Sequence, residues 1–599
     1  MAKNVDVDVP VLIVGGGGAG LTASILLSSL GVPSLLVSRY PGTSTLPKAH
    51  ILNQRSMEIF TDAGVAPAIL ARSAPLENIR GLAWYSGLAG GGPEDGHGRR
   101  LAFTEGWGGG NADPDYIAAS ACATANLPLA RLEPILKAHA ERQPDATVRF
   151  YHELVGLEQD ADRVTATVLD RETGETYTVR SAYLIGSDGG STVGDLVGIK
   201  MSSISEIRRV VSVHMSADLS EYFHDPEPMI RWVFNPEYPE HLGYGCTVMG
   251  MGPDHWGDKS EEWVAHVSPS VAGDAAKNPE NVVRWLSEAL GIPDFNPRIH
   301  QITEWHMETV LAEEFRAGRV FLVGDAAHRH PPSGGLGLSS AIHDASNLCW
   351  KLAAVLAGRA GDSLLDTYAA ERRPVDQANI DSAARTAVNH IGLGSALGVS
   401  PDKTVEENWA ALRLFWEDLP GSAERRHVFS EWLAAQTMEF RQHNTEFGFT
   451  YDSAAIVGDG SPMPVSIDPA RIYVPSTRPG HPLPHAWVTR AGERLALRSL
   501  VHGGHFALIA GEDGQAWVDA AEKLAMQHDI PLRAARVGLR NVDLLDMRLA
   551  WLKNREITSS GAVLVRPDGH IGFRSIGSVD EPLTVLASAF SRILGTTID

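Results

Sequence analysis

The sequence, 599 residues long, predicts an α/β protein that is divided into several domains. Three observations predict this fold class. Between residues 9 and 38 a short apolar run, a group of glycines and an apolar helical stretch follow one another, as where strands of a parallel sheet alternate with helices. Segment 201–316 instead contains β-branched and aromatic runs with partial alternation, typical of an antiparallel sheet with one covered face. From about residue 485 strand and helix patterns mix again.

Composition and charge exclude several classes of function. Lys and Arg number 51 while Asp and Glu number 73, and the formal net charge of −22 repels nucleic acid and anionic lipid. The hydrophobic fraction of 44% and the charged fraction of 21% are those of a folded globular protein. The cysteines, Cys122, Cys246 and Cys349, are too few and too widely spaced for a disulfide framework or a thiolate metal site. We therefore expect no metal, no nucleic-acid partner and a reducing compartment.

One stretch could be mistaken for a membrane span, because no charged residue occurs between Asp8 and Arg39. Pro33 and six glycines interrupt it, whereas a spanning helix needs about twenty apolar helical residues. The amino terminus also differs from a secretory leader, since Asp6 and Asp8 precede the apolar run. A cytoplasmic protein without a membrane partner is expected.

The first element is strand 9–14, which is short, apolar and rich in β-branched residues, as in a strand that is buried on both faces. Glycines with the spacing G-x-G-x-x-G follow at once, and residues 21–30 then read as a helix that ends at Gly31. Strand 33–38 completes the unit, whose helix N-terminus can hold a pyrophosphate through backbone N–H groups. The pattern predicts a dinucleotide site with contacts from Gly15, Gly17, Gly18, Ala19 and Gly20.

An acidic residue that binds a ribose hydroxyl is expected about 20 residues after the glycine motif, at the end of the second strand. Ser38 and Arg39 stand there instead. Ser38 can exchange one hydrogen bond with the ribose, and Arg39 can face the pyrophosphate or the adenine. A solvated surface arginine remains the alternative for Arg39.

A second glycine motif follows a second buried strand. Strand 319–323 leads into Gly324-Asp325, then into the proline pair 331–332 and a glycine loop that ends at Gly337. The next helix is indicated by apolar residues at three- and four-residue steps between 341 and 355. Its N-terminus would stabilise an anion through the unpaired backbone N–H groups.

This order of strand, Gly-Asp, proline pair and glycine loop resembles the second flavin-binding motif of the FAD-dependent aromatic hydroxylases, which are single-component class A monooxygenases. The resemblance implies that Asp325 hydrogen-bonds the ribityl chain of FAD and that the glycine loop runs beside the isoalloxazine ring. The family usually has Asn where Ser339 stands. The implied FAD contacts of this motif are Gly324, Asp325, Pro332, Gly335, Gly337, Leu338 and Ser339.

Two other segments are similar to motifs of the same family. Strand 183–186 enters a turn similar to the family's Asp-Gly motif, which implies that Asp188 takes part in FAD and nicotinamide binding; plain turn chemistry is the alternative. Gln54 and Arg55 match a segment whose arginine lies near the FAD pyrophosphate, with a surface salt bridge as the alternative. Leu129 stands where the family usually has a glutamine, so that contact with FAD is expected to be absent.

The resemblance covers nearly the whole chain and implies a discontinuous Rossmann-type FAD-binding domain over residues 1–80, 110–200 and 317–400. Residues 81–109 and 201–316 are expected to form a β-sheet substrate domain that roofs the flavin. The reappearance of a buried strand and a glycine loop after segment 201–316 is the observation that makes the first domain discontinuous.

The last part of the chain resembles the phenol-hydroxylase branch of the family. A helical connection is expected over 401–460, followed by a Pro/Gly-rich link over 458–484. The resemblance implies a thioredoxin-like domain over 461–599. Because no cysteine follows Cys349, this domain lacks a CxxC motif, and we expect a structural or subunit-contact role.

Segment 46–55 is most similar to chlorophenol 6-monooxygenases and related natural-product hydroxylases. The resemblance implies hydroxylation of a phenol or another electron-rich hydroxyaromatic, from a chlorophenol to the ring of a polyketide-type hydroxypyridine. FAD, NADPH or NADH, and O₂ are implied, with a flavin C4a-hydroperoxide as the oxygen donor. A homo-oligomer, a dimer or larger, is also expected.

Two alternatives stay open at this point. A flavin-dependent halogenase would share the fold, but its Trp-x-Trp-x-Ile-Pro signature occurs nowhere among the 14 tryptophans. A nonenzymatic FAD-binding sensor would show no substrate-stimulated oxidation of NAD(P)H. A plain dehydrogenase is disfavoured, because the second and third motifs would have no task in it.

His50 is the candidate catalytic residue. It lies five residues before Arg55, where yeast-type phenol hydroxylases carry the aspartate that activates the substrate hydroxyl. An imidazole with a reference pKa of about 6.5 can accept that proton near neutral pH. The alternative is a histidine that only hydrogen-bonds the backbone beside the flavin.

Three residues of the predicted antiparallel sheet are candidates for the wall of the substrate pocket. They are Trp232, Tyr244 and Cys246, chosen for the sheet face on which they are expected to lie. Simple core packing is the alternative for each of them.

Overall fold

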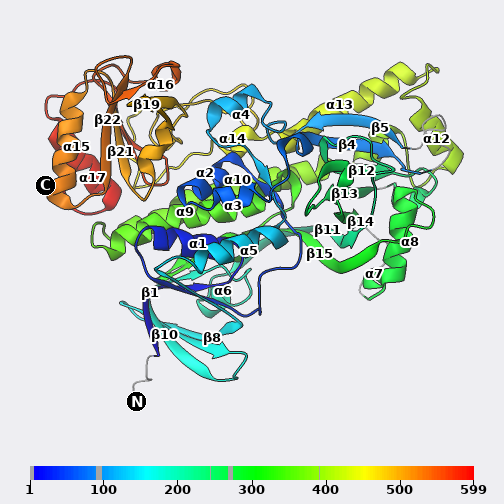
Figure 1. Ribbon diagram of the computed structural model, residues 1–599, viewed down its shortest axis with the longest axis horizontal. Helices are drawn as coiled ribbons and strands as arrows, with labels where there is room; N and C mark the ends of the chain where they lie inside the picture. The colour runs from blue at the N-terminus through cyan, green and yellow to red at the C-terminus, as the bar shows by residue number, and fades with distance from the viewer. Residues whose placement is uncertain (1–5, 90–97, 243–244, 268–273, 390–391, 599) are drawn as a thin grey trace.

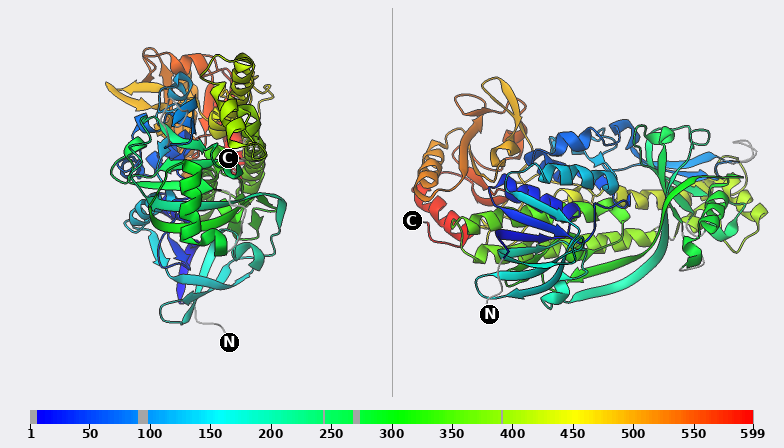
Figure 2. Two further views of the ribbon diagram at one scale, coloured as in Figure 1. Left: turned by 90° about the vertical axis from the view of Figure 1, so that its right-hand side faces the viewer. Right: turned by 60° about the horizontal axis from the view of Figure 1, so that its bottom comes forward.

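The computed structural model describes residues 6–89, 98–242, 245–267, 274–389 and 392–598. In these ranges the chain forms three large sheets. We call the sheet that contains the N-terminal strand the first sheet and the sheet built mainly from residues 201–312 the second sheet. Figure 1 shows the second sheet and the C-terminal sheet at opposite ends of the long axis, with the first sheet and the long helices between them. The right-hand view of Figure 2 shows the same order. Among the described helices, none combines the length and the apolar character needed to cross a bilayer.

The first sheet is mostly parallel and has the strand order β16-β17-β10-β1-β2-β7, with β9 and β8 attached through β10. Consecutive residues of β1, including Leu12 and Ile13, are fully buried, so both faces of this strand are covered. The strands are β1 (Val7–Val14), β2 (Ser34–Ser38), β7 (Ala146–Phe150), β8 (His152–Gln159), β9 (Val164–Asp170), β10 (Thr176–Gly186), β16 (Arg316–Ala317) and β17 (Val320–Leu322).

The helices of this region pack on one another as well as on the sheet, and α1 contacts both α5 and α9. The helix α1 begins at Gly18 rather than at residue 21, because the glycines themselves enter its first turn. A short two-stranded sheet pairs β3 with β6. The elements are α1 (Gly18–Ser29), β3 (Ile51–Leu52), α2 (Gln54–Asp62), α3 (Ala66–Leu70), α4 (Pro114–Ala119), β6 (Ala125–Asn126), α5 (Leu129–Ala140), α6 (Val193–Leu196) and α9 (Leu336–Leu356).

The second sheet has the order β18-β15-β11-β14-β13-β12-β4-β5 and is antiparallel except for the pair β4 and β12. Helix α8 covers one face, where Leu286 packs with Val213 and Cys246. Its elements are β4 (Gly81–Ser86), β5 (Arg99–Glu105), β11 (Met201–Ser216), β12 (Pro228–Phe234), β13 (Cys246–Gly250), β14 (Glu262–Val267), α7 (Asp274–Lys277), α8 (Pro279–Leu290), β15 (Arg298–Ala312) and β18 (His328–Arg329).

A group of helices joins the second sheet to the C-terminal part. Phe429 and Phe440 of α13 pack against the face of the second sheet that α8 leaves uncovered, in one apolar cluster with Trp84 and Trp232. The helices are α10 (Ser363–Asn389), α11 (Leu393–Leu397), α12 (Val405–Arg413), α13 (Ser422–Phe440) and α14 (His443–Glu446). Residues 458–484 then run without helix or strand, apart from a bridge between Pro482 and His570.

The C-terminal sheet has the order β20-β19-β23-β22-β21-β24-β25. Strands β21 and β22 are parallel, β24 and β25 are antiparallel neighbours, and residues of α15 and α17 share an apolar core with β21 and β24. The elements are β19 (Trp487–Arg490), β20 (Glu493–Ala496), β21 (Phe506–Ala510), α15 (Gln515–His528), β22 (Leu532–Gly538), β23 (Leu544–Leu545), α16 (Ala550–Asn554), β24 (Ala562–Val565), β25 (Ile571–Ser575) and α17 (Pro582–Leu594).

Candidate active site

The first glycine motif forms a turn into which no side chain fits. Gly15 has φ +121°, and a Cβ there would lie 2.2 Å from the carbonyl oxygen of Ser187 in the turn after β10. A Cβ on Gly20 would lie 2.0 Å from the carbonyl oxygen of Gly15. Gly17 caps α1, and the N-terminus of this helix can stabilise an anion, although the backbone N–H of Gly18 is already bonded to the carboxylate of Glu133. These features fit the pyrophosphate of a dinucleotide.

Glu133 lies at this turn, a contact that the sequence did not reveal. Its Oε1 accepts a hydrogen bond from the backbone N–H of Gly18 at 3.2 Å, and its Oε2 accepts from Ser44 N–H at 2.8 Å. Burial raises the pKa of Glu133, the two backbone N–H groups lower it, and the nearby carboxylate of Asp325 raises it again. The segment around Ser44, helix α5 and the second glycine motif therefore meet at the start of α1.

The second motif offers an acceptor and a second open helix N-terminus. Asp325 is exposed, and no hydrogen bond to its carboxylate is present within the described part of the chain. Gly335, with φ +68°, caps α9 without a side-chain hydrogen bond, and a Cβ there would lie 3.3 Å from Ile51. Trp107 Nε1 donates to the carbonyl oxygen of Gly334 at 3.4 Å and ties this loop to the segment after β5. The free carboxylate and the cap suit the ribityl chain and the flavin ring.

The remaining predicted cofactor residues lie in different settings. Ser38 is buried beside the first glycine turn, since a Cβ on Gly16 would lie 2.9 Å from the Cβ of Ser38. Arg39 donates to the hydroxyl of the exposed Tyr40 at 2.9 Å. Asp188 accepts hydrogen bonds from Gly190 N–H and Val193 N–H, so its carboxylate shapes its own turn. Ser339 Oγ is buried and accepts from the backbone N–H of Asn53 at 3.4 Å.

The side chains of Gln54 and Arg55 have protein partners, both within α2 and on other elements. Gln54 Nε2 donates to the carbonyl oxygens of Tyr116 and Cys122, each at 2.8 Å. Arg55 is buried, pairs with Glu58 at 2.5 Å and lies 4.4 Å over the ring of Phe447. These contacts place Arg55 at a junction of α2 with the chain after α14.

A row of side chains crosses the second sheet on the face opposite α8. The cross-strand pairs are Trp84 with Trp232, Trp232 with Thr247, Thr247 with His266, and His266 with Ser212. Because directly paired residues of neighbouring strands project to the same face, these side chains form one row. Trp84 and Trp232 stack with ring centroids 5.8 Å apart. The row is apolar at one end and polar at the other.

His50 comes to the same face of the sheet. The next residue, Ile51 of β3, packs in one apolar cluster with Trp84 and Trp232. The ring Nδ1 of His50 lies 2.8 Å from Asn126 Oδ1, and because a carboxamide oxygen only accepts, Nδ1 carries the proton and Nε2 keeps its lone pair. Burial lowers the pKa of His50, while the hydrogen bond to Asn126 raises it. The net lowering keeps the ring neutral near pH 7.

The polar end of the row has a fixed hydrogen-bond order. Trp305 Nε1 donates to Ser212 Oγ at 2.7 Å, and Ser212 Oγ lies 2.7 Å from His266 Nδ1. Burial, followed by the charge of His50, lowers the pKa of His266 to about 4. His266 is therefore a neutral imidazole at neutral pH, close enough to His50 to be influenced by its charge.

The three predicted pocket residues do not share one wall. Trp232 lies in the row described above, whereas Cys246 is paired with Val233 and points to the opposite face, into the core with α8. The separation follows from strand geometry, because neighbouring residues along β12 alternate between the two faces. Tyr244 lies outside the described residues.

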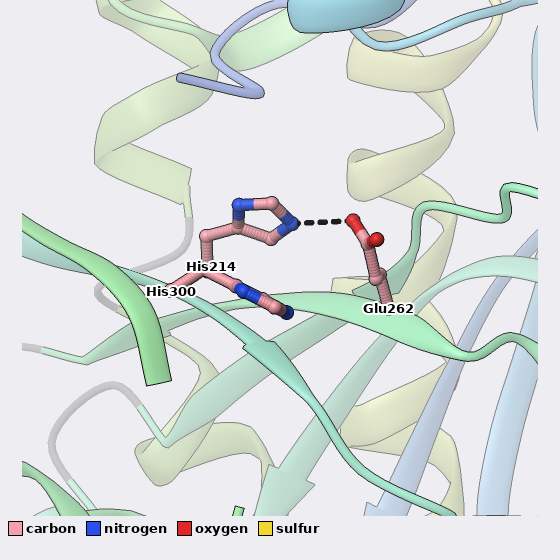
Figure 3. Close-up of side chains that lie close together, drawn as sticks. All are labelled: His214, Glu262 and His300. Carbon is pink, nitrogen blue, oxygen red and sulfur yellow. Dashed lines mark hydrogen bonds and ion pairs between the residues drawn. The ribbon is translucent and has the colours of Figure 1, made fainter. Parts of the chain in front are cut away.

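A group of charged side chains lies farther along this face of the second sheet, and Figure 3 shows His214 pointing toward Glu262. His214 Nε2 lies 2.7 Å from Glu262 Oε2, and Arg131 of α5 pairs with the same carboxylate at 2.9 Å. His300 is near but bonds Ser216 Oγ at 2.6 Å. Since Arg131 already supplies positive charge, we interpret the group as an ion-pair contact between α5 and the sheet.

A sheet with two open helix N-termini, joined to a sheet whose aromatic face meets the second glycine loop, defines a flavoprotein of the oxygenase type. Residues 8–383 match the FAD binding domain family, and residues 476–597 match the C-terminal family of aromatic-ring hydroxylases. The chain thus belongs to the FAD-dependent aromatic-ring hydroxylases and is an FAD-dependent aromatic monooxygenase.

Individual relatives agree with this assignment. Phenol 2-monooxygenase of Pseudomonas sp. (strain EST1001) is 34% identical over 592 residues, which cover 98% of this chain and 93% of the relative. The 2,4-dichlorophenol 6-monooxygenase of Delftia acidovorans is 35% identical and covers 98% of each chain. The crystal structure of the flavin-dependent monooxygenase PieE with FAD and substrate has a TM-score of 0.90 at 37% identity, covering 99% of this chain and 100% of that chain. These names favour hydroxylation over the halogenase and sensor alternatives.

Proposed function

We propose that this monooxygenase uses NADPH or NADH and O₂ to hydroxylate a phenol or another electron-rich hydroxyaromatic ring, and that His50 removes the proton of the substrate hydroxyl. The observation that carries the proposal is the position of His50, whose Nε2 is left unprotonated by the Asn126 contact and whose ring lies near His266 of the second sheet. Bound FAD supplies the activation of dioxygen. The residues of this chain supply position, proton transfer and exclusion of water.

The contacts proposed for FAD come from both glycine motifs. The first turn would hold the pyrophosphate through Gly15, Gly17, Gly18, Ala19 and Gly20, with Ser38 beside it. Asp325 would accept hydrogen bonds from the ribityl hydroxyls, supported by its exposure and its free carboxylate. The loop from Pro332 through Gly335, Gly337 and Leu338 to Ser339 would lie along the flavin ring. The layout supports a discontinuous FAD-binding domain of Rossmann type.

The substrate ring would lie between this loop and the row on the second sheet. Beside this position Trp84, Trp232 and Phe440 of α13 are buried in one apolar cluster, with the Phe440 centroid 6.3 Å from that of Trp232. Trp107 packs edge-on against Phe440 at 5.5 Å. Such a wall accepts a flat aromatic ring and keeps water from the reacting centre.

The protonation state of His50 suits a general base. The Asn126 contact orients the ring and keeps the proton on Nδ1, so Nε2 is the atom that accepts the substrate proton. The lowered pKa keeps this atom unprotonated at neutral pH. A substrate anion then forms inside the pocket, where the ring becomes a stronger nucleophile toward activated oxygen.

For the C-terminal sheet we propose a thioredoxin-like domain with a structural or subunit-contact role. The parallel pair β21 and β22 beside antiparallel β24 and β25, with α15 and α17, supports this fold. Cys349 is the last cysteine of the chain, so the C-terminal domain has no cysteine that could take part in thiol exchange. A cytoplasmic homo-oligomer remains part of the proposal.

The variants His50→Ala and His50→Gln test the proposed function. Wild-type protein should consume O₂ and NADPH or NADH faster when a hydroxyaromatic such as 2,4-dichlorophenol is added, and should release hydroxylated product. Both variants should retain FAD, while product formation drops by roughly 10²–10⁴-fold, the usual contribution of a general base. Wild-type turnover and an unchanged pH profile in both variants would remove His50 from the mechanism.

A further inference from the structure

We propose that His266 is a second substrate contact: its Nε2–H donates a hydrogen bond to the same substrate oxygen from which His50 removes the proton. This inference rests on the proposed function and extends it. It makes the site a donor and acceptor pair around one oxygen, and it assigns the pocket to ligands that bind as phenolate anions.

The position of His266 follows from the pairing of the strands. It is the fourth member of the row Trp84, Trp232, Thr247, His266 and Ser212, so it shares the face of the aromatic wall. The adjacent Ile51 packs in one apolar cluster with the two tryptophans, and His50 lies close enough to His266 for its charge to lower the pKa of His266. A ring stacked along Trp232 would therefore extend its hydroxyl toward the polar end of the row. His266 keeps part of its surface accessible, whereas Thr247 is buried.

The hydrogen-bond chain behind His266 sets its tautomer. An indole N–H can only donate, so Trp305 occupies one lone pair of Ser212 Oγ. The single hydroxyl hydrogen of Ser212 then has His266 Nδ1, at 2.7 Å, as its acceptor within the described residues. An imidazole that accepts at Nδ1 and is neutral carries its proton on Nε2. Nε2 is thus a donor.

The two histidines are complementary. Asn126 leaves the Nε2 of His50 as an acceptor, and Ser212 leaves the Nε2 of His266 as a donor. Within the described part of the chain no hydrogen bond joins the two rings, and Nε2 of each ring has no hydrogen-bond partner there. The groups that face His266 are His50, Ser212 and Trp305, and the low pKa of about 4 keeps His266 a neutral donor throughout the neutral range.

The proton transfer can be written completely. The substrate O–H bond breaks, the proton passes to Nε2 of His50, and the electron pair stays on the substrate oxygen. His50 becomes an imidazolium, and the N–H of His266 stabilises the oxygen anion. A preorganised donor aimed at developing charge is the arrangement that stabilises such an anion most strongly.

The test uses the FAD-loaded protein and 4-nitrophenol, whose anion and neutral form have different visible spectra. Difference titrations give the pKa of the bound phenol and the dissociation constant for wild type, His266→Phe and His266→Gln. We expect His266→Phe to raise the pKa of bound 4-nitrophenol by about one unit or more and to weaken binding of the anion about 10- to 100-fold, as for losing a hydrogen bond to a charged group. His266→Gln retains an N–H donor and should restore most of the effect.

His300→Phe is the matched control, because it replaces a histidine of the same sheet outside the row, and it should leave the bound pKa unchanged. The proposal is overturned if His266→Phe binds 4-nitrophenol with the wild-type pKa, or if wild type binds it only in the neutral form. Failure of the proposed function gives a distinguishable result. If His50 is not the base, His50→Ala hydroxylates at the wild-type rate, while His266→Phe still shifts the pKa of bound 4-nitrophenol.

Discussion

The carboxylate of Asp344 accepts a hydrogen bond from the backbone N–H of Gly324 at 2.9 Å, so that a residue of α9 holds the turn that carries Asp325. The same carboxylate accepts from Arg372 Nε at 2.7 Å and lies 2.8 Å from His328 Nε2. All of these groups except Asp325 are buried. The cofactor turn is thereby fixed from inside by an ionic cluster.

Replacing Asp344 by Asn should weaken both this cluster and the turn. Removing one charge from a buried ion pair typically costs about 3–5 kcal/mol of unfolding free energy. We expect a lower urea midpoint and faster loss of FAD on dilution, measured by flavin fluorescence. The control is Asp366→Asn, which changes an exposed carboxylate of α10. Equal stability of the two variants would contradict the inferred role of Asp344.

Replacing Asp325 by Ala should affect FAD rather than the fold. The side chain is exposed, so the urea midpoint of the apoprotein should stay at the wild-type value. The affinity for FAD should fall by about 1–3 kcal/mol, the usual cost of leaving a polar partner unpaired. Fluorescence titration of apoprotein with FAD measures it, with Asp195→Ala in α6 as the exposed control. An unchanged affinity would place the ribityl chain elsewhere.

Stability should fall in alkaline solution because of His328. Burial lowers its pKa, but the carboxylates of Asp376 and Asp344 outweigh burial and raise it to about 9 despite the opposing charge of Arg372. A folded-state pKa above the unfolded value of about 6.5 means that the contribution is complete below pH 6.5 and is lost as pH rises through 9. Melting temperatures from pH 6 to 10 should show this decline, and His328→Gln should flatten it. An identical slope in the variant would assign the decline to other groups.

The C-terminal sheet should depend on Arg566. Its guanidinium contacts both carboxylate oxygens of Glu371 in α10, at 2.6 and 2.8 Å, and Lys351 of α9 pairs with the same carboxylate at 2.8 Å. Arg566→Met leaves a buried carboxylate with one cation fewer, at a cost of about 3–5 kcal/mol. Hydrogen exchange in β21 and β24 should report the loss. The exposed pair Arg163 and Asp8 provides the control, with an expected cost below about 1 kcal/mol for Arg163→Met.

The elements of the fold were largely predictable, because their signals are local. The strand at Val7–Val14, the glycine turn and the helix at Leu336–Leu356 are each encoded by a few adjacent residues. The boundary errors have a local cause too: α1 begins at Gly18 because glycines tolerate the tight contact with Gly15 and Ser187. The FAD contacts expected from the two glycine motifs remain predictions.

The substrate side of the site was not predictable from sequence, because its members meet only through strand register. Thr247 and His266 come together with Trp232 by cross-strand pairing, and a shift of one residue would have turned each to the other face. Cys246 depends on strand register in the same way, because its place in the register turns its side chain into the core with α8. Glu133 contacts Gly18 across 115 positions of the sequence, and no local pattern marks that contact.

The order of the elements has a consequence for the synthesis of the chain. The parallel neighbour of β10 on its outer side is β17, which follows only after every strand of the second sheet except β18 has been made. At about 5–20 residues per second, the ribosome leaves this edge of β10 open for a time on the order of ten seconds. Open strand edges invite pairing with other chains, so the nascent protein passes through an aggregation-sensitive interval. If the loop before α9 contacts FAD as proposed, the complete FAD site forms only once α9 has emerged.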